Sequence, residues 1–204
     1  ASPLVGTITE ETCPRNLHPY ATSHLAGEHA VLSASQRGQI QGVVLRISNG
    51  FGAPVHKDAS CWMLLVNDLC RQAAQTRRLV LQTSGLQQRD FVCMTEVCRV
   101  AEALVVADGI SIKPPVFNVG AGVSQSVLEI ATLIQQRCSI VLGFEPFLDF
   151  KQADADEEQP RLSYMSDHLA SAGISVKSMD KVIEIDELLQ FCQRGFPKEA
   201  SINI

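Results

Sequence analysis

A short run of aliphatic and β-branched residues at positions 42–47 (GVVLRI) most constrains how this chain can fold. It follows residues 20–35, in which apolar residues recur with helical spacing, and it stops at the glycine- and proline-containing stretch 49–54. A continuous apolar strand directly after a helix is typical of a strand buried in a parallel sheet. The pattern therefore predicts a buried strand within an α/β fold.

Further helical and extended patterns alternate along the rest of the chain. Thr95 is expected to cap one helix, and Ser126 with Glu129 has the spacing of a capping box at the start of another. The alternation predicts the α/β class, although few core strands are visible for a complete doubly wound sheet. Helices are predicted at residues 20–35, 62–76, 95–107, 126–136, 165–172 and 185–192, and strands at residues 42–47, 79–82 and 116–120.

Composition narrows the classes of partner. The 204 residues are 46% hydrophobic and 19% charged, which is ordinary for a globular protein with a core. A net charge of −5 argues against nucleic acid as the main partner, because phosphate binding needs a basic face. No apolar run reaches the roughly 18–20 residues that span a bilayer, and no signal peptide is visible, so we expect a cytoplasmic protein without a membrane partner. The seven cysteines form no C-x-x-C pair, which argues against a zinc site.

Residues 19–28 (PYATSHLAGE) carry the clearest chemical signal. A phenol is a poor base at neutral pH, and a cation one helical turn later, on the same face, would lower its pKa. The segment resembles the active-site helix of extended short-chain dehydrogenases, in which a lysine follows the tyrosine by four residues. Here Tyr20 keeps the tyrosine, and His24 stands at the lysine position with only part of a positive charge at neutral pH. The resemblance implies that Tyr20 and His24 are catalytic and contact the cofactor. The alternative is a partly buried core tyrosine beside a surface histidine.

Two later motifs concern ligand binding. Residues 46–54 (RISNGFGAP) resemble the family loop that passes the nicotinamide, which implies a cofactor contact for Ser48 and a substrate contact for Asn49. Residues 85–92 (GLQQRDFV) resemble the family's arginine–aspartate–aromatic motif, which implies that Arg89 binds the nucleotide diphosphate with its planar fork. The alternatives are an ordinary loop at 46–54 and a surface ion pair of Arg89 with Asp90 or Glu96.

Together with the glycine turn at residues 117–122, these motifs run in the order of the NAD(P)-dependent nucleotide-sugar epimerase/dehydratase family. The resemblance implies the C-terminal portion of a Rossmann-type parallel sheet fold plus a small α/β substrate-binding domain. Residues 1–52 would complete the Rossmann-like domain with the active-site helix. Residues 53–204 would form mainly the substrate-binding domain, with a return to the Rossmann core near 90–108. The implied ligands are NAD or NADP and a nucleotide sugar, and the helix bearing Tyr20 implies a possible homodimer.

The family's G-x-x-G-x-x-G turn, which receives the cofactor pyrophosphate at a helix N-terminus, does not occur in the sequence. We therefore expect a C-terminal part of such an enzyme, truncated or impaired as it stands. The alternative is a non-catalytic binding or partner module that retains the substrate half of the fold. A hydrolase or metal enzyme using His18, His24 and His29 is disfavoured, since spacings of six and five do not align them on one helical face.

Overall fold

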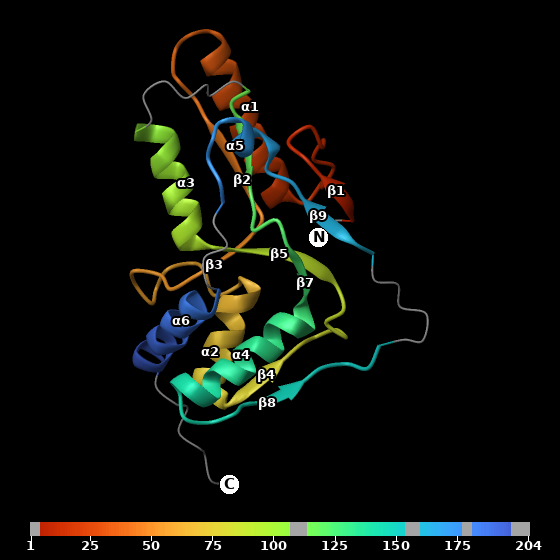
Figure 1. The fold of residues 1–204 in the computed structure, drawn as a ribbon, viewed down its shortest axis with the longest axis vertical. Helices are drawn as coiled ribbons and strands as arrows, with labels where there is room; N and C mark the ends of the chain where they lie inside the picture. Colours follow the sequence, from red (N-terminus) through yellow and green to blue (C-terminus); the bar gives the residue numbers. More distant parts are fainter. Residues whose placement is uncertain (1–4, 107–113, 154–159, 177–180, 197–204) are drawn as a thin grey trace.

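The computed structural model describes residues 5–106, 114–153, 160–176 and 181–196, and its elongated shape has an upper and a lower part (Figure 1). The strands are β1 (Gly6–Ile8), β2 (Val44–Ile47), β3 (Asn49–Phe51), β4 (Arg78–Val80), β5 (Gln88–Cys93), β6 (Val116–Val119), β7 (Ser124–Ser126), β8 (Phe147–Asp149) and β9 (Leu162–Tyr164). The helices are α1 (Pro19–Gln36), α2 (Leu65–Thr76), α3 (Met94–Val106), α4 (Val127–Val141), α5 (Asp167–Ser171) and α6 (Lys181–Gly195).

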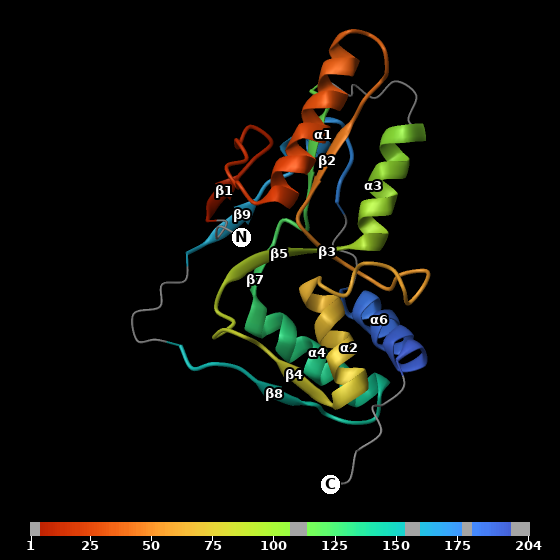
Figure 2. The same ribbon diagram turned by 180° about the vertical axis from the view of Figure 1, so that it is seen from behind.

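The upper part is built on two parallel strand pairs. Strand β2 pairs with β6, with Val44 opposite Val116, and β1 pairs with β9. Helices α3 and α5 pack on the β2–β6 pair around one apolar cluster, while α1 lies along the outside of β2 (Figure 2). The buried members of this cluster are Val92, Val97, Val100, Leu104, Phe117, Val119, Leu169 and Ile174.

The lower part is a three-helix cluster with a short parallel strand pair, β4–β8. Helices α2, α4 and α6 bury their facing sides against one another, and Phe51 and Phe91 close the top of this core. The fully buried Asn67 ties α2 to the chain above it. Its amide nitrogen donates to the carbonyl of Gly52 at 2.9 Å, and its oxygen accepts from the Gly52 amide at 3.2 Å. The side chain thus mimics a paired strand.

A three-stranded strip, β3–β5–β7, joins the two parts. Strand β3 runs parallel to β5, and β7 runs antiparallel to it. Because side chains alternate across a strand, Phe91 enters the lower core and Val92 the upper one. Helices α2, α3, α4 and α6 all begin near this strip and run away from it (Figure 1).

The mixed α/β fold with parallel strand pairs confirms the predicted class. The predicted capping box is confirmed, because Ser126 accepts from the Glu129 amide at 3.0 Å and Glu129 accepts from the Ser126 amide at 2.6 Å. The cap assigned to Thr95 is wrong. The helix already begins at Met94, and the Thr95 hydroxyl donates to the Glu184 carboxylate of α6 instead. The division at residues 52 and 53 stays a prediction.

The seven cysteines should differ sharply in reactivity. Cys13 and Cys98 are exposed, Cys61 is intermediate, and Cys70, Cys93, Cys138 and Cys192 are buried. Since a disulfide reagent must reach the sulfur, we expect Cys13 and Cys98 to react fast in the native protein. The four buried thiols should react only after denaturation. Quantitative thiol titration with peptide mapping checks this, and fast labelling of Cys70, Cys138 or Cys192 would contradict the packing of α2, α4 and α6.

Candidate functional site

The carboxylate of Asp90 joins three segments at the junction of the two parts. Asp90 is only 1% exposed, and its Oδ1 accepts from the Ser48 hydroxyl at 2.6 Å and from the Ala121 amide at 2.8 Å. These bonds fix the end of β2 and the turn after β6 against β5. The hydroxyl of Ser48, predicted to contact a cofactor, is therefore turned toward Asp90.

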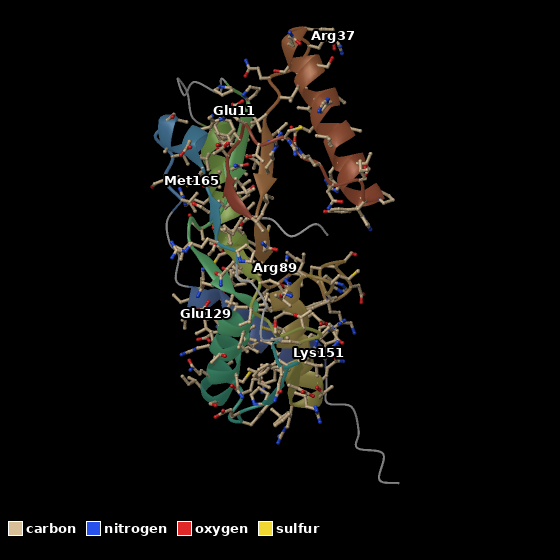
Figure 3. All side chains as sticks on the ribbon, turned by 90° about the vertical axis from the view of Figure 1, so that its right-hand side faces the viewer. Glu11, Arg37, Arg89, Glu129, Lys151 and Met165 are labelled. Atoms are coloured by element: carbon tan, nitrogen blue, oxygen red, sulfur yellow. The ribbon has the colours of Figure 1, made fainter. Side chains whose placement is uncertain are left out.

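Asn49 and Arg89 lie together on the neighbouring face of the strip. The amide nitrogen of Asn49 donates to the backbone oxygen of Asp90 at 2.9 Å, which leaves its own oxygen pointing to Arg89. The Arg89 Nη1 reaches that oxygen at 3.4 Å, and its buried Nε has no hydrogen-bond partner among the described residues. The ion pairs considered for Arg89 are not formed, since Asp90 holds Ser48 and Ala121, and Glu96 holds Arg99. Arg89 lies between the upper and lower parts (Figure 3).

Tyr20 and His24 form a second group on α1. The helix begins after His18, whose ring accepts from the Tyr20 amide at 3.3 Å. One turn later the ring of His24 lies 4.3 Å from the Tyr20 ring, centroid to centroid. Tyr20 is 68% exposed, so the alternative of a partly buried core tyrosine is wrong. In the described part of the chain, no hydrogen bond or ring contact joins this pair to Ser48, Asn49 or Arg89.

Arg46 fastens α1 to the sheet. Its guanidinium forms a two-point ion pair with Glu28 of α1, at 2.5 and 3.1 Å, and also donates to the backbone oxygen of Glu10 at 2.8 Å. The Glu28 carboxylate raises the pKa of Arg46 further. Both residues lie within the predicted motifs, but the contact between them was not predicted. Because α1 has no fully buried residue, this ion pair is a main determinant of where Tyr20 and His24 lie.

A second tyrosine that sequence reasoning missed lies inside the junction. The hydroxyl of Tyr164 donates to the Arg46 carbonyl at 2.8 Å and contacts Asn118 Oδ1 at 3.2 Å. Burial raises the pKa of this phenol, which disfavours a role as a base. No motif around residue 164 distinguishes it from an ordinary core tyrosine.

Gly120 is required by the close approach of Tyr164 and Asp90. A Cβ atom at position 120 would lie 2.5 Å from Tyr164 Cδ1 and 2.9 Å from Asp90 Oδ1. We expect Gly120→Ala to lower the free energy of unfolding by about 2 kcal/mol, because a buried ring and a bonded carboxylate would have to move. Urea unfolding measures this, with Gly27→Ala on α1 as control, since a Cβ there meets nothing within 4 Å. Equal stability of the two variants would show that the junction is loosely packed.

No group of three or more His, Cys, Asp or Glu side chains is placed to hold a metal ion within the described ranges. None of the described helices is long and apolar enough to cross a membrane.

Comparison with known proteins identifies relatives. Residues 2–120 match the NAD dependent epimerase/dehydratase family. A dTDP-6-deoxy-L-talose 4-dehydrogenase (NAD(P)(+)) from Kitasatospora kifunensis is 33% identical over 139 residues, which are 67% of this chain and 42% of the relative. A UDP-glucuronic acid 4-epimerase from Bacillus cereus, solved with NAD, has a TM-score of 0.71 at 20% identity, over 96% of this chain and 57% of its own. A dTDP-glucose 4,6-dehydratase from Bacillus anthracis, also solved with NAD, has a TM-score of 0.69 at 18% identity, over 94% of this chain and 57% of its own.

The chain thus spans about half the length of the relatives it matches. The structural matches agree with the parallel strand pairs, and the family match covers α1, the 46–54 loop, β5 and the turn that begins at Gly120. More than half of the chain lies within that match. The protein therefore belongs to the NAD dependent epimerase/dehydratase family.

Proposed function

We propose that this chain supplies the substrate-binding and proton-transfer part of an NAD(P)-dependent epimerase, dehydratase or reductase of nucleotide sugars. The observation that carries the proposal is the Arg89 guanidinium, held beside Asn49 with a buried Nε that has no partner among the described residues. A guanidinium without a carboxylate partner suits a phosphate, which it can bind through two parallel hydrogen bonds. Asn49 adds a polar group for the same ligand.

Tyr20 is the group we propose for proton transfer. Its phenol is exposed and reaches solvent or a ligand, unlike the buried phenol of Tyr164. His24 lies against the same ring and is placed to polarise the phenol or to hold a ligand hydroxyl. In this proposal Tyr20 would take the proton of a sugar hydroxyl, while the hydride from the carbon bearing that hydroxyl would go to the oxidised nicotinamide of NAD or NADP.

The described residues do not fit the pyrophosphate of a dinucleotide cofactor. The Gly120–Gly122 turn leads into strand β7 and not into a helix, and its Ala121 amide is already bonded to Asp90. The hydroxyl of Ser48 is likewise bonded to Asp90. We propose that Tyr20 and His24 contact the nicotinamide end of NAD or NADP and that other residues hold the pyrophosphate.

Ligand binding tests the substrate class directly. Saturation-transfer NMR with UDP-, GDP-, CDP- and dTDP-sugars should detect binding of at least one, and titration gives its dissociation constant. Arg89→Ala should weaken that binding by about 10- to 100-fold, the range for losing a charge-assisted hydrogen bond to a phosphate. Arg194→Ala, an exposed arginine in the last turn of α6, is the matched control. Absence of binding to all four classes would refute the assignment.

A non-catalytic partner module is the second candidate, favoured by His24 at the position where the family has a lysine. Adding a glycine-rich strand–turn–helix segment in trans should give NAD(P)-dependent turnover only under the catalytic proposal. In that complemented protein His24→Lys should raise turnover severalfold, because a permanent cation replaces a partly charged imidazole. If turnover stays at background both in the complemented protein and in its His24→Lys variant, the non-catalytic partner module is favoured.

Helix α1 is a candidate surface for a homodimer. None of its residues is fully buried, and Tyr20 and the preceding Leu17 are largely exposed. We expect a concentration-dependent dimer in light scattering, and Ala30→Lys on the exposed side of the helix should dissociate it. A monomer at all concentrations up to about 100 μM would contradict a stable interface of this kind.

A further inference from the structure

The first residue of α6 brings a second cation to the β3–β5–β7 strip. Lys181 is partly buried, and its ammonium donates to Gln125 Oε1 of β7 at 2.6 Å. Gln125 is a neutral partner, so the bond satisfies a hydrogen of the ammonium without balancing its charge. In the described part of the chain, Lys181 forms no ion pair with a carboxylate.

Gln125 also places Lys181 relative to Arg89. In the antiparallel pairing of β5 and β7, Gln125 is the direct partner of Arg89. Side chains at directly opposed positions lie on the same face of a ladder, about 5 Å apart at their Cβ atoms. Gln125 therefore shares a face of the strip with Arg89 and also bonds the Lys181 ammonium of α6.

The carboxylate of Asp90 offsets the charge of Lys181 only in part, and within the described residues it forms no hydrogen bond with Lys181 or Arg89. Asp90 follows Arg89 in β5, so its side chain lies on the opposite face of the strand, where Ser48 and Ala121 hold it. Burial lowers the pKa of Lys181, and the field of Asp90 opposes that shift. Among the described residues no carboxylate is bonded to the Lys181 ammonium, so an anion that binds there would lower the free energy cost of its burial.

The backbone around the strip also contributes partial positive charge. Helices α2, α4 and α6 all begin here, and the N-terminus of a helix carries a partial positive charge (Figure 1). The only acidic residue in the first turn of α6 is Glu184, and it is bonded to the Thr95 hydroxyl. Asp68 and Glu129 lie in the first turns of α2 and α4, so the positive charge of this face comes mainly from Arg89 and Lys181.

We propose that Lys181 is a second phosphate-binding residue of the substrate site, which holds the diphosphate of the nucleotide sugar together with Arg89. Gln125 positions the ammonium for that contact. This inference rests on the proposed function and adds a determinant that distinguishes a diphosphate from a monophosphate, because two separated cations match two phosphate groups. Lys181 binds substrate in this proposal and takes no part in proton transfer.

Isothermal titration calorimetry with UDP, GDP, CDP and dTDP and with the matching monophosphates tests the proposal on the full chain. Lys181→Gln should weaken the binding of the preferred diphosphate by about tenfold, the usual effect of one charge-assisted contact, and should weaken that of the monophosphate much less. Lys181→Arg should restore most of the affinity. Lys57→Gln removes the same charge beside Gly195 at the other end of α6 and should leave binding unchanged.

The outcomes separate the two proposals. If the unmodified chain binds none of these four diphosphates, the proposed function fails and the role of Lys181 fails with it. If it binds and Arg89→Ala weakens binding while Lys181→Gln does not, only the role of Lys181 is overturned. An equal loss for diphosphate and monophosphate in Lys181→Gln would also overturn it, because it would reflect displacement of α6 and not loss of a phosphate contact. Circular dichroism melting of each variant shows whether α6 is still folded.

Discussion

Raising the pH from 9 to 11 is expected to destabilise this protein steeply, because three buried thiols must ionise when the chain unfolds. Cys70, Cys138 and Cys192 are fully buried, one in each helix of the lower core. Burial raises the pKa of Cys138 and of Cys192 to about 12, and it raises that of Cys70 well above its ordinary value of 9. The folded state therefore keeps protons that the unfolded state releases.

The direction of the effect follows from proton linkage. Between pH 9 and 12 the unfolded chain binds fewer protons than the folded one, so the free energy of unfolding falls as the pH rises. Each thiol contributes a slope of about 1.4 kcal/mol per pH unit, and three together about 4 kcal/mol per unit. Tyr164, whose pKa is also raised by burial, adds to this loss above pH 10. Lys181 has the opposite effect. Burial lowers its pKa, so this lysine alone would raise the free energy of unfolding with rising pH, and it offsets part of the loss.

Urea unfolding under reducing conditions at pH 8, 9, 10 and 10.5 measures the slope, with the fluorescence of the single tryptophan, Trp62, as probe. Cys138→Ala should make the slope shallower by about 1.4 kcal/mol per pH unit, although loss of packing lowers stability at pH 8 as well. Cys98→Ala removes an exposed thiol and should leave the slope unchanged. Identical slopes for all three proteins would show that the three-helix core does not hold protonated thiols.

Local signals account for what the sequence could predict. The capping box at Ser126 was predictable because its hydrogen bonds join residues three apart. The contact between Tyr20 and His24 follows equally from the geometry of one helical turn. The predicted strand at 42–47 appears as β2, since a continuous aliphatic run has no competing helical pattern. Its predicted burial is wrong, because none of the β2 residues is fully buried and Ile47 is exposed.

Contacts between distant segments could not be predicted from such signals. Strand β5 was missed because its first three residues are polar, and β3 and β7 span only three residues each, which is too short for a periodic pattern. Without those strands the register that sets Gln125 opposite Arg89 is invisible, and so is the approach of Lys181. The interaction of Ser48 with Asp90, 42 positions later in the chain, depends on the same register. Family resemblance named the ligand-binding residues, but their partners required the structure.

Removing the Arg46 side chain is the second change with a large expected effect. In Arg46→Met, the Glu28 carboxylate, with only 11% of its side chain exposed, loses both of its hydrogen bonds to the guanidinium. The backbone oxygen of Glu10 loses a donor as well. Leaving one member of such a pair without its partner costs about 3 kcal/mol, because the remaining charge stays partly shielded from water. The cost should fall mainly on α1, since no residue of that helix is fully buried.

Hydrogen exchange separates this local effect from global unfolding. In Arg46→Met, the backbone amides of α1 should exchange at least about 100-fold faster, while those of α4 in the lower core keep their protection more closely. Arg37→Met is the matched control. It removes an exposed arginine after the C-terminal end of the same helix, where the guanidinium bonds only Ser33 and Gln39 (Figure 3). We expect that variant to change stability by less than about 0.5 kcal/mol.

The double variant Arg46→Met, Glu28→Met distinguishes an ion pair from simple packing. If the single substitution is costly because Glu28 is left charged and unpaired, removing that charge should recover much of the lost stability. If Arg46 acts only through its bonds to the backbone at Glu10, the second substitution should recover nothing. Because α1 carries Tyr20 and His24, Arg46→Met should also lower any turnover of a complemented enzyme. It should not alter the affinity for dTDP or UDP, because Arg89 and Lys181 bind these nucleotides in our proposal. A parallel loss of nucleotide affinity would contradict the separation of the two groups of site residues.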